Sequence, residues 1–112
     1  MDERFRRDER IRSSKDYALV YRDGGRIRGK MFTLVVRRND LGHGRLGVVV
    51  SRKVGSAVVR NRVKRRCRDI FRRNKRILPG PLDLVILTRP SIAAASRPEI
   101  AESLKEALRK IV

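Results

Sequence analysis

The sequence has almost none of the residues that build disulfide frameworks, metal clusters or aromatic cores. Its 112 residues include one Cys, one His and no Trp, and aromatic residues make up 4% of the chain. A single cysteine, Cys67, excludes an internal disulfide and is compatible with a reducing cytoplasm. Zinc clusters normally need about four ligands, which Cys67 and His43 cannot supply. We therefore expect an aliphatic core, with Cys67 as a small buried side chain that has no redox or metal role.

Long apolar segments are also missing. No stretch reaches the roughly 20 unbroken apolar residues that span a bilayer, and the charged start MDERFRRDERIR lacks the apolar core of a secretory signal. The sequence thus predicts a cytoplasmic protein with no membrane partner. Its length suits one domain, for which we expect the range 13–112, preceded by a flexible charged extension over residues 1–12.

Residues for catalysis by the protein itself are scarce. The single His43 cannot complete a Ser-His-Asp or Cys-His arrangement. The aspartates lie on different predicted elements, which argues against a two-metal carboxylate cluster. These are Asp16, Asp23, Asp40, Asp69 and Asp83. We expect that the chain alone is not a nuclease and binds no metal ion tightly.

Positive charge is what the sequence has in excess, with a net charge of +18. Residues 52–76 hold twelve Lys or Arg and one acid, so this segment alone carries 12 − 1 = +11. A merely solvated surface usually mixes the two signs. Such an excess predicts an anionic partner, either nucleic acid or a membrane surface.

Hydrophobic periodicity predicts an α+β domain in the order α-β-β-α-β-α. Ser13 and Asp16 are spaced as a capping pair, and Ser56 can cap the basic helix. The first two strands are joined by the polar turn NDLGHG, which predicts an antiparallel hairpin. The expected elements are helix 13–23, strands 31–38 and 45–51, helix 57–75, strand 82–88 and helix 97–112.

The helix over 57–75 has one apolar stripe, formed by Val59, Val63, Cys67, Ile70 and Phe71. The row Arg60, Lys64 and Arg68 occupies another face, flanked by Asn61, Arg65 and Arg72. Three interpretations compete for this cationic face. Repulsion without partner charges argues against a solvated helix, and the narrow apolar stripe argues against membrane insertion. Binding of phosphates remains, because guanidinium groups can contact backbone oxygens and displace counterions.

The segment SRKVGSAVVRNRVKRRCRDIFR (51–72) resembles the signature of the bacterial ribonuclease P protein component. It joins the RKVG turn, the small residues SAV and the central RNR in one register, and the resemblance extends over about residues 10–112. It implies a single-domain α/β sandwich with a left-handed βαβ crossover, similar to the second domain of a small-subunit ribosomal protein.

The resemblance also implies site residues. The RNR helix would pack against the catalytic RNA, and a cleft between the first helix and the sheet would receive the 5′ leader of precursor tRNA. Val35 stands where some members carry a strand tyrosine. The implied RNA contacts are Arg52, Lys53, Arg60, Asn61, Arg62, Lys64, Arg65 and Arg68. The implied leader cleft comprises Tyr17, Tyr21, Lys30, Phe32 and Ser51.

By this resemblance, the chain assists a ribonucleoprotein that removes the tRNA leader. The RNA subunit would carry the chemistry and bind most of the Mg²⁺, and no protein partner is implied. The alternative from another class is a structural ribosomal protein or a nonspecific nucleic-acid binder. A helix-turn-helix DNA reader fits less well, because strands flank the basic helix.

Overall fold

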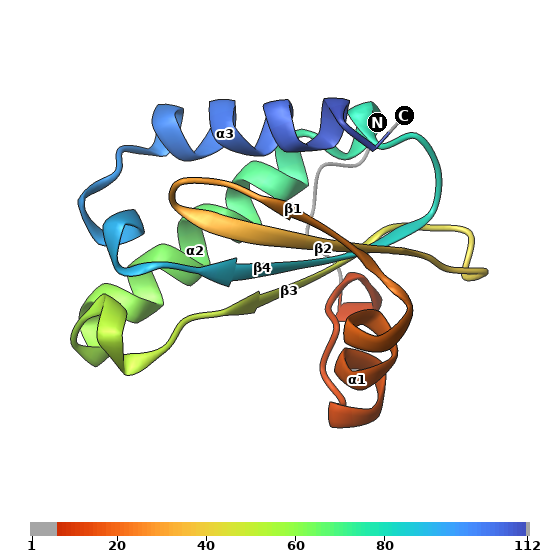
Figure 1. The fold of residues 1–112 in the computed structure, drawn as a ribbon, viewed down its shortest axis with the longest axis horizontal. Coiled ribbons are helices and arrows are strands. Elements are labelled where there is room, and N and C mark those ends of the chain that lie inside the picture. The colour runs from red at the N-terminus through yellow and green to blue at the C-terminus, as the bar shows by residue number, and fades with distance from the viewer. Residues whose placement is uncertain (1–6, 112) are drawn as a thin grey trace.

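The computed structural model describes residues 7–111, which form three α-helices and one four-stranded sheet (Figure 1). The elements are α1 (Ser14–Asp23), β1 (Gly25–Arg28), β2 (Phe32–Arg38), β3 (Arg45–Val49), α2 (Ala57–Arg73), β4 (Leu82–Thr88) and α3 (Arg97–Arg109). Serine side chains cap these three helices: the Oγ atoms of Ser13, Ser56 and Ser96 each accept a backbone N–H from the first turn. The sequence predicted the caps at Ser13 and Ser56, and the cap at Ser96 is an addition from the structure. No helix in this described part is both long and apolar enough to cross a membrane.

The predicted α+β class is confirmed, but the predicted strand pairing is wrong. The sheet order is β1-β2-β4-β3, so β4 lies between the two strands that we expected to form a hairpin. β4 pairs antiparallel with β2 and parallel with β3. The short strand β1, absent from the predicted order, pairs with β2 through a tight turn at Gly29. β4 is buried along most of its length, as expected of a central strand. The predicted hairpin rested on the turn between β2 and β3 alone, and such a local pattern does not show that a later strand lies between them.

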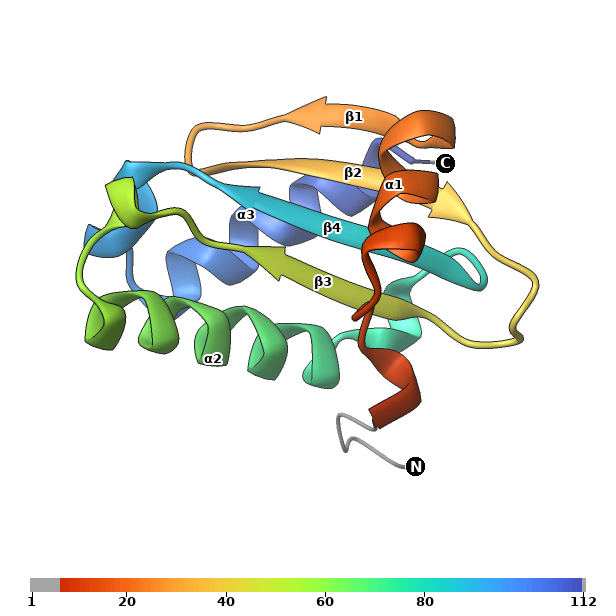
Figure 2. The same ribbon diagram turned by 90° about the horizontal axis from the view of Figure 1, so that it is seen from below.

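The connection from β3 through α2 to β4 is left-handed. In Figure 2, α1 lies on the near side of the sheet, α2 and α3 lie on the far side, and β3 and β4 run in the same direction. When the view is turned so that these strands point upward, β4 lies to the right of β3 while the connecting helix passes behind them. A right-handed crossover would reverse that order, and nearly all known crossovers are right-handed. The crossover expected from the family resemblance is therefore present.

The two faces of the sheet carry two unequal cores. Even-numbered residues of β2, β3 and β4 point toward α2 and α3 and form the larger core, in which Cys67 is fully buried. Burial raises the pKa of the Cys67 thiol to about 12, so it stays neutral at physiological pH. Odd-numbered residues such as Val35 and Val85 point toward α1 and form a small cluster with Val20. The helix α1 is short and crosses only one end of its face (Figure 1), so much of this face is left without a covering helix.

The segment before α1 is packed against the sheet, in contrast to the flexible extension expected over residues 1–12. Arg10 forms a parallel bridge with Leu46, whose carbonyl accepts the Ile11 N–H at 3.0 Å. The Ile11 side chain is only 4% exposed, because it joins the small apolar cluster under α1. Structure therefore begins before residue 13, and residues 1–6 lie outside the described residues.

A buried carboxylate ties α1 and three strands together. Asp83 on β4 is fully buried and accepts two hydrogen bonds from Arg45, at 2.9 and 2.8 Å, and one from Asn39 at 2.8 Å. Arg45 also donates to Asp16 of α1 at 3.0 Å. Burial alone would raise the pKa of Asp83, but the bonds from Arg45 and Asn39 and the charges of Arg45 and Arg37 lower it. The ionised form is thus the stable form in the folded protein.

We expect Asp83→Asn to lower the free energy of unfolding at pH 7 by about 3 kcal/mol, because Arg45 would lose its buried partner. Since the pKa of Asp83 is lowered on folding, its contribution is present above the unfolded value near ~3.9 and is lost as pH falls through the folded value. Urea unfolding at pH 7 and below pH 4 should therefore show a difference from wild type that shrinks in acid. Asp40→Asn, at an exposed turn, is the matched control. A constant difference across this pH range would contradict the assignment.

Candidate nucleic-acid interface

The helix α2 lies along the edge of the sheet, and its apolar stripe is buried as predicted. Val63, Cys67, Ile70 and Phe71 are buried, and Val59 is partly buried against the same core. The remaining residues form two flanks and an outward face, because 3.6 residues make one turn. One flank faces α3 and the other faces β3 and α1. The cations on the two flanks differ in whether they bond to other residues of the protein.

On the flank that faces α3, cations are tied to the protein itself. Arg66 donates to the Ala95 carbonyl at 2.9 Å and Arg62 donates to the Ala93 carbonyl at 3.3 Å. Asp69 forms ion pairs with Arg72 and Arg73 of the same helix and with Arg97 at the start of α3. These bonds hold α3 and the turn before it against α2. Arg62, which the family resemblance places among the RNA contacts, therefore also has a structural partner.

On the opposite flank, cations lack such partners. Arg60, Lys64 and Arg68 follow one another at a spacing of four, and their side chains form no hydrogen bond or ion pair with residues 7–111. The Nε atom of Arg60 is buried without a partner. Asn61 and Arg65 point outward beside this row and are exposed. The row, with Asn61 and Arg65, forms the cationic surface of α2.

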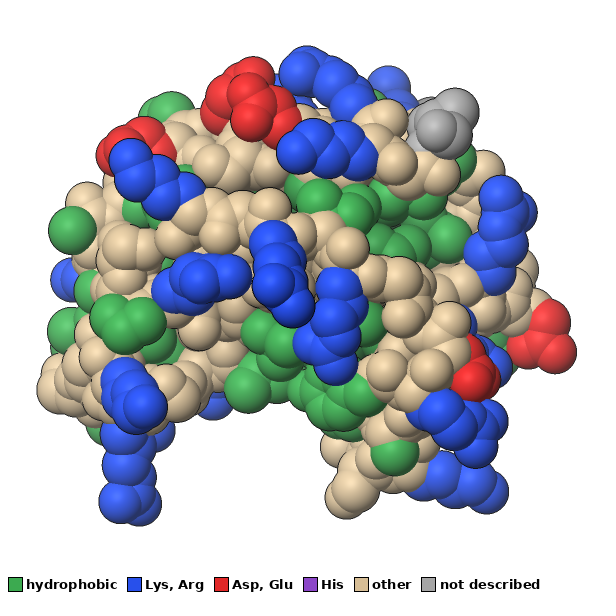
Figure 3. All heavy atoms as spheres, viewed as in Figure 1, with side chains coloured by type: hydrophobic (Ala, Val, Ile, Leu, Met, Phe, Trp, Pro, Cys, Tyr) green, Lys and Arg blue, Asp and Glu red, His purple; other side chains and the backbone are tan. Residues whose placement is uncertain are grey.

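A hollow adjoins this surface. Figure 3 shows a concave lower side between α1 and the start of α2, with hydrophobic side chains at its roof and basic side chains on its rims. On this face of the sheet, Val49 is 38% exposed and Leu87 is half-buried. Tyr17 and Tyr21 are half-buried on the adjoining side of α1, with ring centroids 6.1 Å apart. We call this concave region the cleft.

Tyr17 lies against β3 because residue 47 is glycine. A Cβ atom at Gly47 would come within 2.6–2.8 Å of the Tyr17 ring and hydroxyl, so any other residue would displace the ring. Burial and the neighbouring Tyr21 raise the pKa of Tyr17, although Arg68 opposes this shift. The ring of Tyr21 is more open and lies under Arg26, whose guanidinium carbon is 5.9 Å from the ring centroid. Both tyrosines are thus neutral at physiological pH, and each presents a flat face.

Of the other predicted cleft residues, Ser51 is accessible, and its place in the cleft stays a prediction. It is exposed at the end of β3 and begins the turn Arg52–Val54, where Arg52 and Lys53 are also exposed. The assignment of Phe32 to the cleft is wrong. Phe32 is 2% exposed and packs in the core on the opposite face, since side chains alternate along β2.

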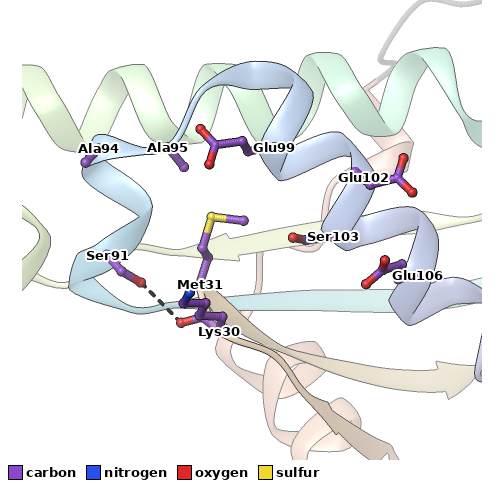
Figure 4. Close-up of a pocket in the computed structure, with 9 residues that line it drawn as sticks. All are labelled: Lys30, Met31, Ser91, Ala94, Ala95, Glu99, Glu102, Ser103 and Glu106. Carbon is purple, nitrogen blue, oxygen red and sulfur yellow. Dashed lines mark hydrogen bonds between the residues drawn. The ribbon is translucent and has the colours of Figure 1, made fainter.

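Lys30 does not join the tyrosines either. It lies in the turn between β1 and β2 and lines a pocket of about 470 Å³ beneath α3. Figure 4 shows Lys30 and Met31 opposite Glu99, Glu102 and Glu106, which all come from α3. The structure therefore separates Lys30 from the cleft.

Sequence reasoning missed several polar residues on the face that bears the cleft. Arg26 and Arg28 of β1 pair with Val35 and Thr33, so all four side chains lie on this face. Arg89 donates to the Thr33 hydroxyl at 3.2 Å at the same end of the sheet. The alternation in GRIRG (25–29) was the available signal for β1. Val35 itself is fully buried under α1.

The fold and the cationic surface beside an open sheet face define a small RNA-binding α+β protein. Residues 5–112 match the sequence profile of the family described as Ribonuclease P. The chain belongs to this family, whose proteins serve as the protein component of the ribonucleoprotein endoribonuclease ribonuclease P. The resemblance read from residues 51–72 is confirmed.

Known relatives cover most of the chain. It is 41% identical over 93 residues to the ribonuclease P protein component of Thermotoga maritima, which covers 83% of this chain and 80% of that protein. It is 43% identical over 102 residues to that of Syntrophobacter fumaroxidans, covering 90% and 86%. The solved Thermotoga maritima protein superposes with a TM-score of 0.84 at 34% identity over 93% of this chain and 98% of that one. A Staphylococcus aureus RNase P protein gives 0.84 at 29% identity, over 92% and 94%.

Arg65 and Arg66 are neighbours in sequence but lie on different sides of α2, so we expect their replacement by Ala to have different effects. Arg65→Ala should leave the free energy of unfolding unchanged within ~0.5 kcal/mol, weaken binding to the catalytic RNA and reduce its salt slope by about one unit. Arg66→Ala should lower the free energy of unfolding by about 1–2 kcal/mol, because the buried Ala95 carbonyl would lose a charged donor. Denaturant unfolding and salt-dependent RNA binding measure the two effects. Equal changes in both variants would show that the flanks do not differ.

Proposed function

We propose that the cationic surface of α2 binds the backbone of the catalytic RNA of ribonuclease P. The observation that carries this proposal is the row Arg60, Lys64 and Arg68, whose side chains have no partner within the described range 7–111, although Asp69 on the same helix is bonded to three arginines. A phosphate backbone supplies the missing negative charge, and release of its counterions favours binding. Arg52 and Lys53, exposed in the turn before α2, extend the same surface.

We propose further that the cleft receives the single-stranded 5′ leader of precursor tRNA. Its position between α1 and the start of α2, its partly apolar roof and its basic rims suit bases stacked above a sheet with phosphates at the edges. Tyr17 and Tyr21 supply ring faces, while Arg26 and Arg28 supply positive charge. Ser51 stands at the end of β3 as a neutral hydrogen-bonding group.

Hydrolysis in this scheme belongs to the RNA subunit and its Mg²⁺. Among residues 7–111, no group of three or more His, Cys, Asp or Glu side chains is placed to hold a metal ion. Asp83, the most buried carboxylate among the residues that the structure describes, is already bonded to Arg45 and Asn39. The protein would act by binding both RNAs and neutralising phosphates, so that the RNA needs less Mg²⁺ to reach its active arrangement. We propose the cytoplasm as the compartment for this work.

Reconstitution with the catalytic RNA tests the proposal. Adding the protein should increase cleavage of precursor tRNA at low Mg²⁺, where the RNA alone is slow, and should matter little at high Mg²⁺. A variant with Arg60, Lys64 and Arg68 all changed to Gln should lose this effect while its unfolding transition stays intact. A nonspecific nucleic-acid binder, the alternative from the other class, would give no gain at low Mg²⁺.

The leader cleft predicts a difference between two substrates. Tyr21→Ala should weaken binding of precursor tRNA by about 1–3 kcal/mol, the usual scale of one base–aromatic stack. Binding of mature tRNA, which has no leader, should barely change, and assembly with the catalytic RNA should be unaffected. Tyr21→Phe, which keeps the ring face, is the matched control and should bind both tRNAs normally. Equal losses for precursor and mature tRNA would contradict the assignment of the leader to the cleft.

A further inference from the structure

The guanidinium group of Arg26 lies over the ring of Tyr21 at the side of the cleft. Its central carbon is 5.9 Å from the ring centroid. Two planar groups in direct contact are about 3.5–4 Å apart, so Arg26 stands over the ring without being stacked tightly on it. Because Arg26 is exposed to water, its attraction to the ring at this distance is weak.

A tight turn holds these two side chains together. Tyr21 belongs to the last part of α1 and Arg26 to β1, and Gly24 between them donates its N–H to the Val20 carbonyl at 2.8 Å. A Cβ atom at residue 24 would lie 2.5 Å from that carbonyl oxygen, so a larger residue would displace the turn. The Tyr17 ring, 6.1 Å away and tilted by 40°, restricts the movement of the Tyr21 ring. The ring is thus held in place, whereas the long Arg26 side chain can move.

No other bond restrains the guanidinium group. The Arg26 side chain forms no hydrogen bond or ion pair with residues 7–111. Asp23, at the end of α1, is bonded to Arg22 at 2.9 Å and lies 3.7 Å from Arg37. A base between ring and guanidinium needs two stacking distances, about 7 Å, which is about 1 Å more than the 5.9 Å observed. Opening the pair to this width therefore breaks no hydrogen bond or ion pair of Arg26 within residues 7–111.

We propose that Tyr21 and Arg26 form a clamp that holds one unpaired RNA base, with the ring on one side and the guanidinium plane on the other. Aromatic rings and guanidinium planes both stack on unpaired bases. Lysine would supply the same charge as Arg26 but no plane, so the clamp depends on more than charge. This deepens the proposed leader cleft, on which it rests, by giving one leader nucleotide a fixed position between α1 and β1.

Arg28 provides a matched control for Arg26. It lies on the same face of β1, opposite Thr33, and does not stand over a tyrosine ring. Arg26→Lys and Arg28→Lys both keep the charge, but only the first removes the plane of the clamp. In the reconstituted enzyme we expect Arg26→Lys to weaken binding of precursor tRNA about fivefold, and Arg28→Lys to leave it unchanged. Both variants should bind mature tRNA normally.

Two outcomes separate the clamp from the leader cleft. Equal affinities of Arg26→Lys and Arg28→Lys for precursor tRNA would overturn the clamp, even where Tyr21→Ala shows that the leader lies in the cleft. If Tyr21→Ala weakens binding of precursor and mature tRNA equally, the leader cleft is lost and the clamp with it.

Leaders that lack one base at a time identify the clamped nucleotide. In the wild-type protein, removal of that base should weaken binding about twentyfold, within the range of base–aromatic stacking. The same removal should cost only about fourfold in Arg26→Lys, because the guanidinium plane is already missing and contacting groups are not additive. Arg28→Lys should show the full loss. If every removal costs as much in Arg26→Lys as in the wild type, Arg26 holds no base.

Tyrosine fluorescence tests the clamp in the protein alone. The chain has no Trp and two Tyr, so Tyr17→Phe leaves Tyr21 as the only tyrosine. We expect a single-stranded RNA oligonucleotide to quench its emission by stacking, whereas the same strand in a duplex, with its bases paired, should not. In this background Arg26→Lys should raise the RNA concentration at half-quenching about fivefold, and Arg28→Lys should not. Equal quenching by strand and duplex, or coincident titrations of the two variants, would contradict the proposal.

Discussion

The arrangement of the whole molecule depends on β4, which pairs with β3 on one side and β2 on the other and is buried along five of its seven residues. Its parallel pairing with β3 requires the chain to cross over between them, and α2 is that crossover. Asp83, at the start of β4, holds Arg45 of β3 and Asn39 after β2, while Arg45 also holds Asp16 of α1. The basic helix and the helix that forms the cleft are thereby fixed to the same strand.

The arginines of α2 that are bonded within the protein and the cations that we propose to bind RNA lie on different flanks of this helix. Asp69 and two backbone carbonyls engage the arginines that face α3, which stabilises the contact between α2 and α3. Among residues 7–111, no carboxylate is bonded to Arg60, Lys64 or Arg68 on the opposite flank, so binding of an anion there would reduce the repulsion among these cations. Much of the favourable free energy of RNA binding is then electrostatic, and it should depend strongly on salt.

The cleft exists because α1 is short. Its ten residues cover one end of the sheet face, over the cluster of Val20, Val35 and Val85, and leave Val49 and Leu87 partly open. A longer helix would complete a second core and remove the surface on which bases can stack. The left-handed crossover places α2 on the opposite face, so this helix does not cover the open part of the α1 face. In the proposed function, a strand of RNA would contact the cleft and then α2 at the β3 edge of the sheet.

The sequence by itself determined the α+β class, the starts of the helices, the caps at Ser13 and Ser56 and the two faces of α2, because these follow from local periodicity and spacing. The basic helix and the last helix end at Arg73 and Arg109, before the predicted residues 75 and 112. It also determined the family, through the register of RKVG, SAV and RNR. Strand order, the absence of a β2–β3 hairpin and the packing of Ile11 were decided only in the tertiary structure, since they depend on contacts between residues far apart in the chain. The same is true of the site residues. Phe32 and Thr33 are neighbours in sequence, yet the alternation of β2 against two different layers places one in the core and the other on the open face.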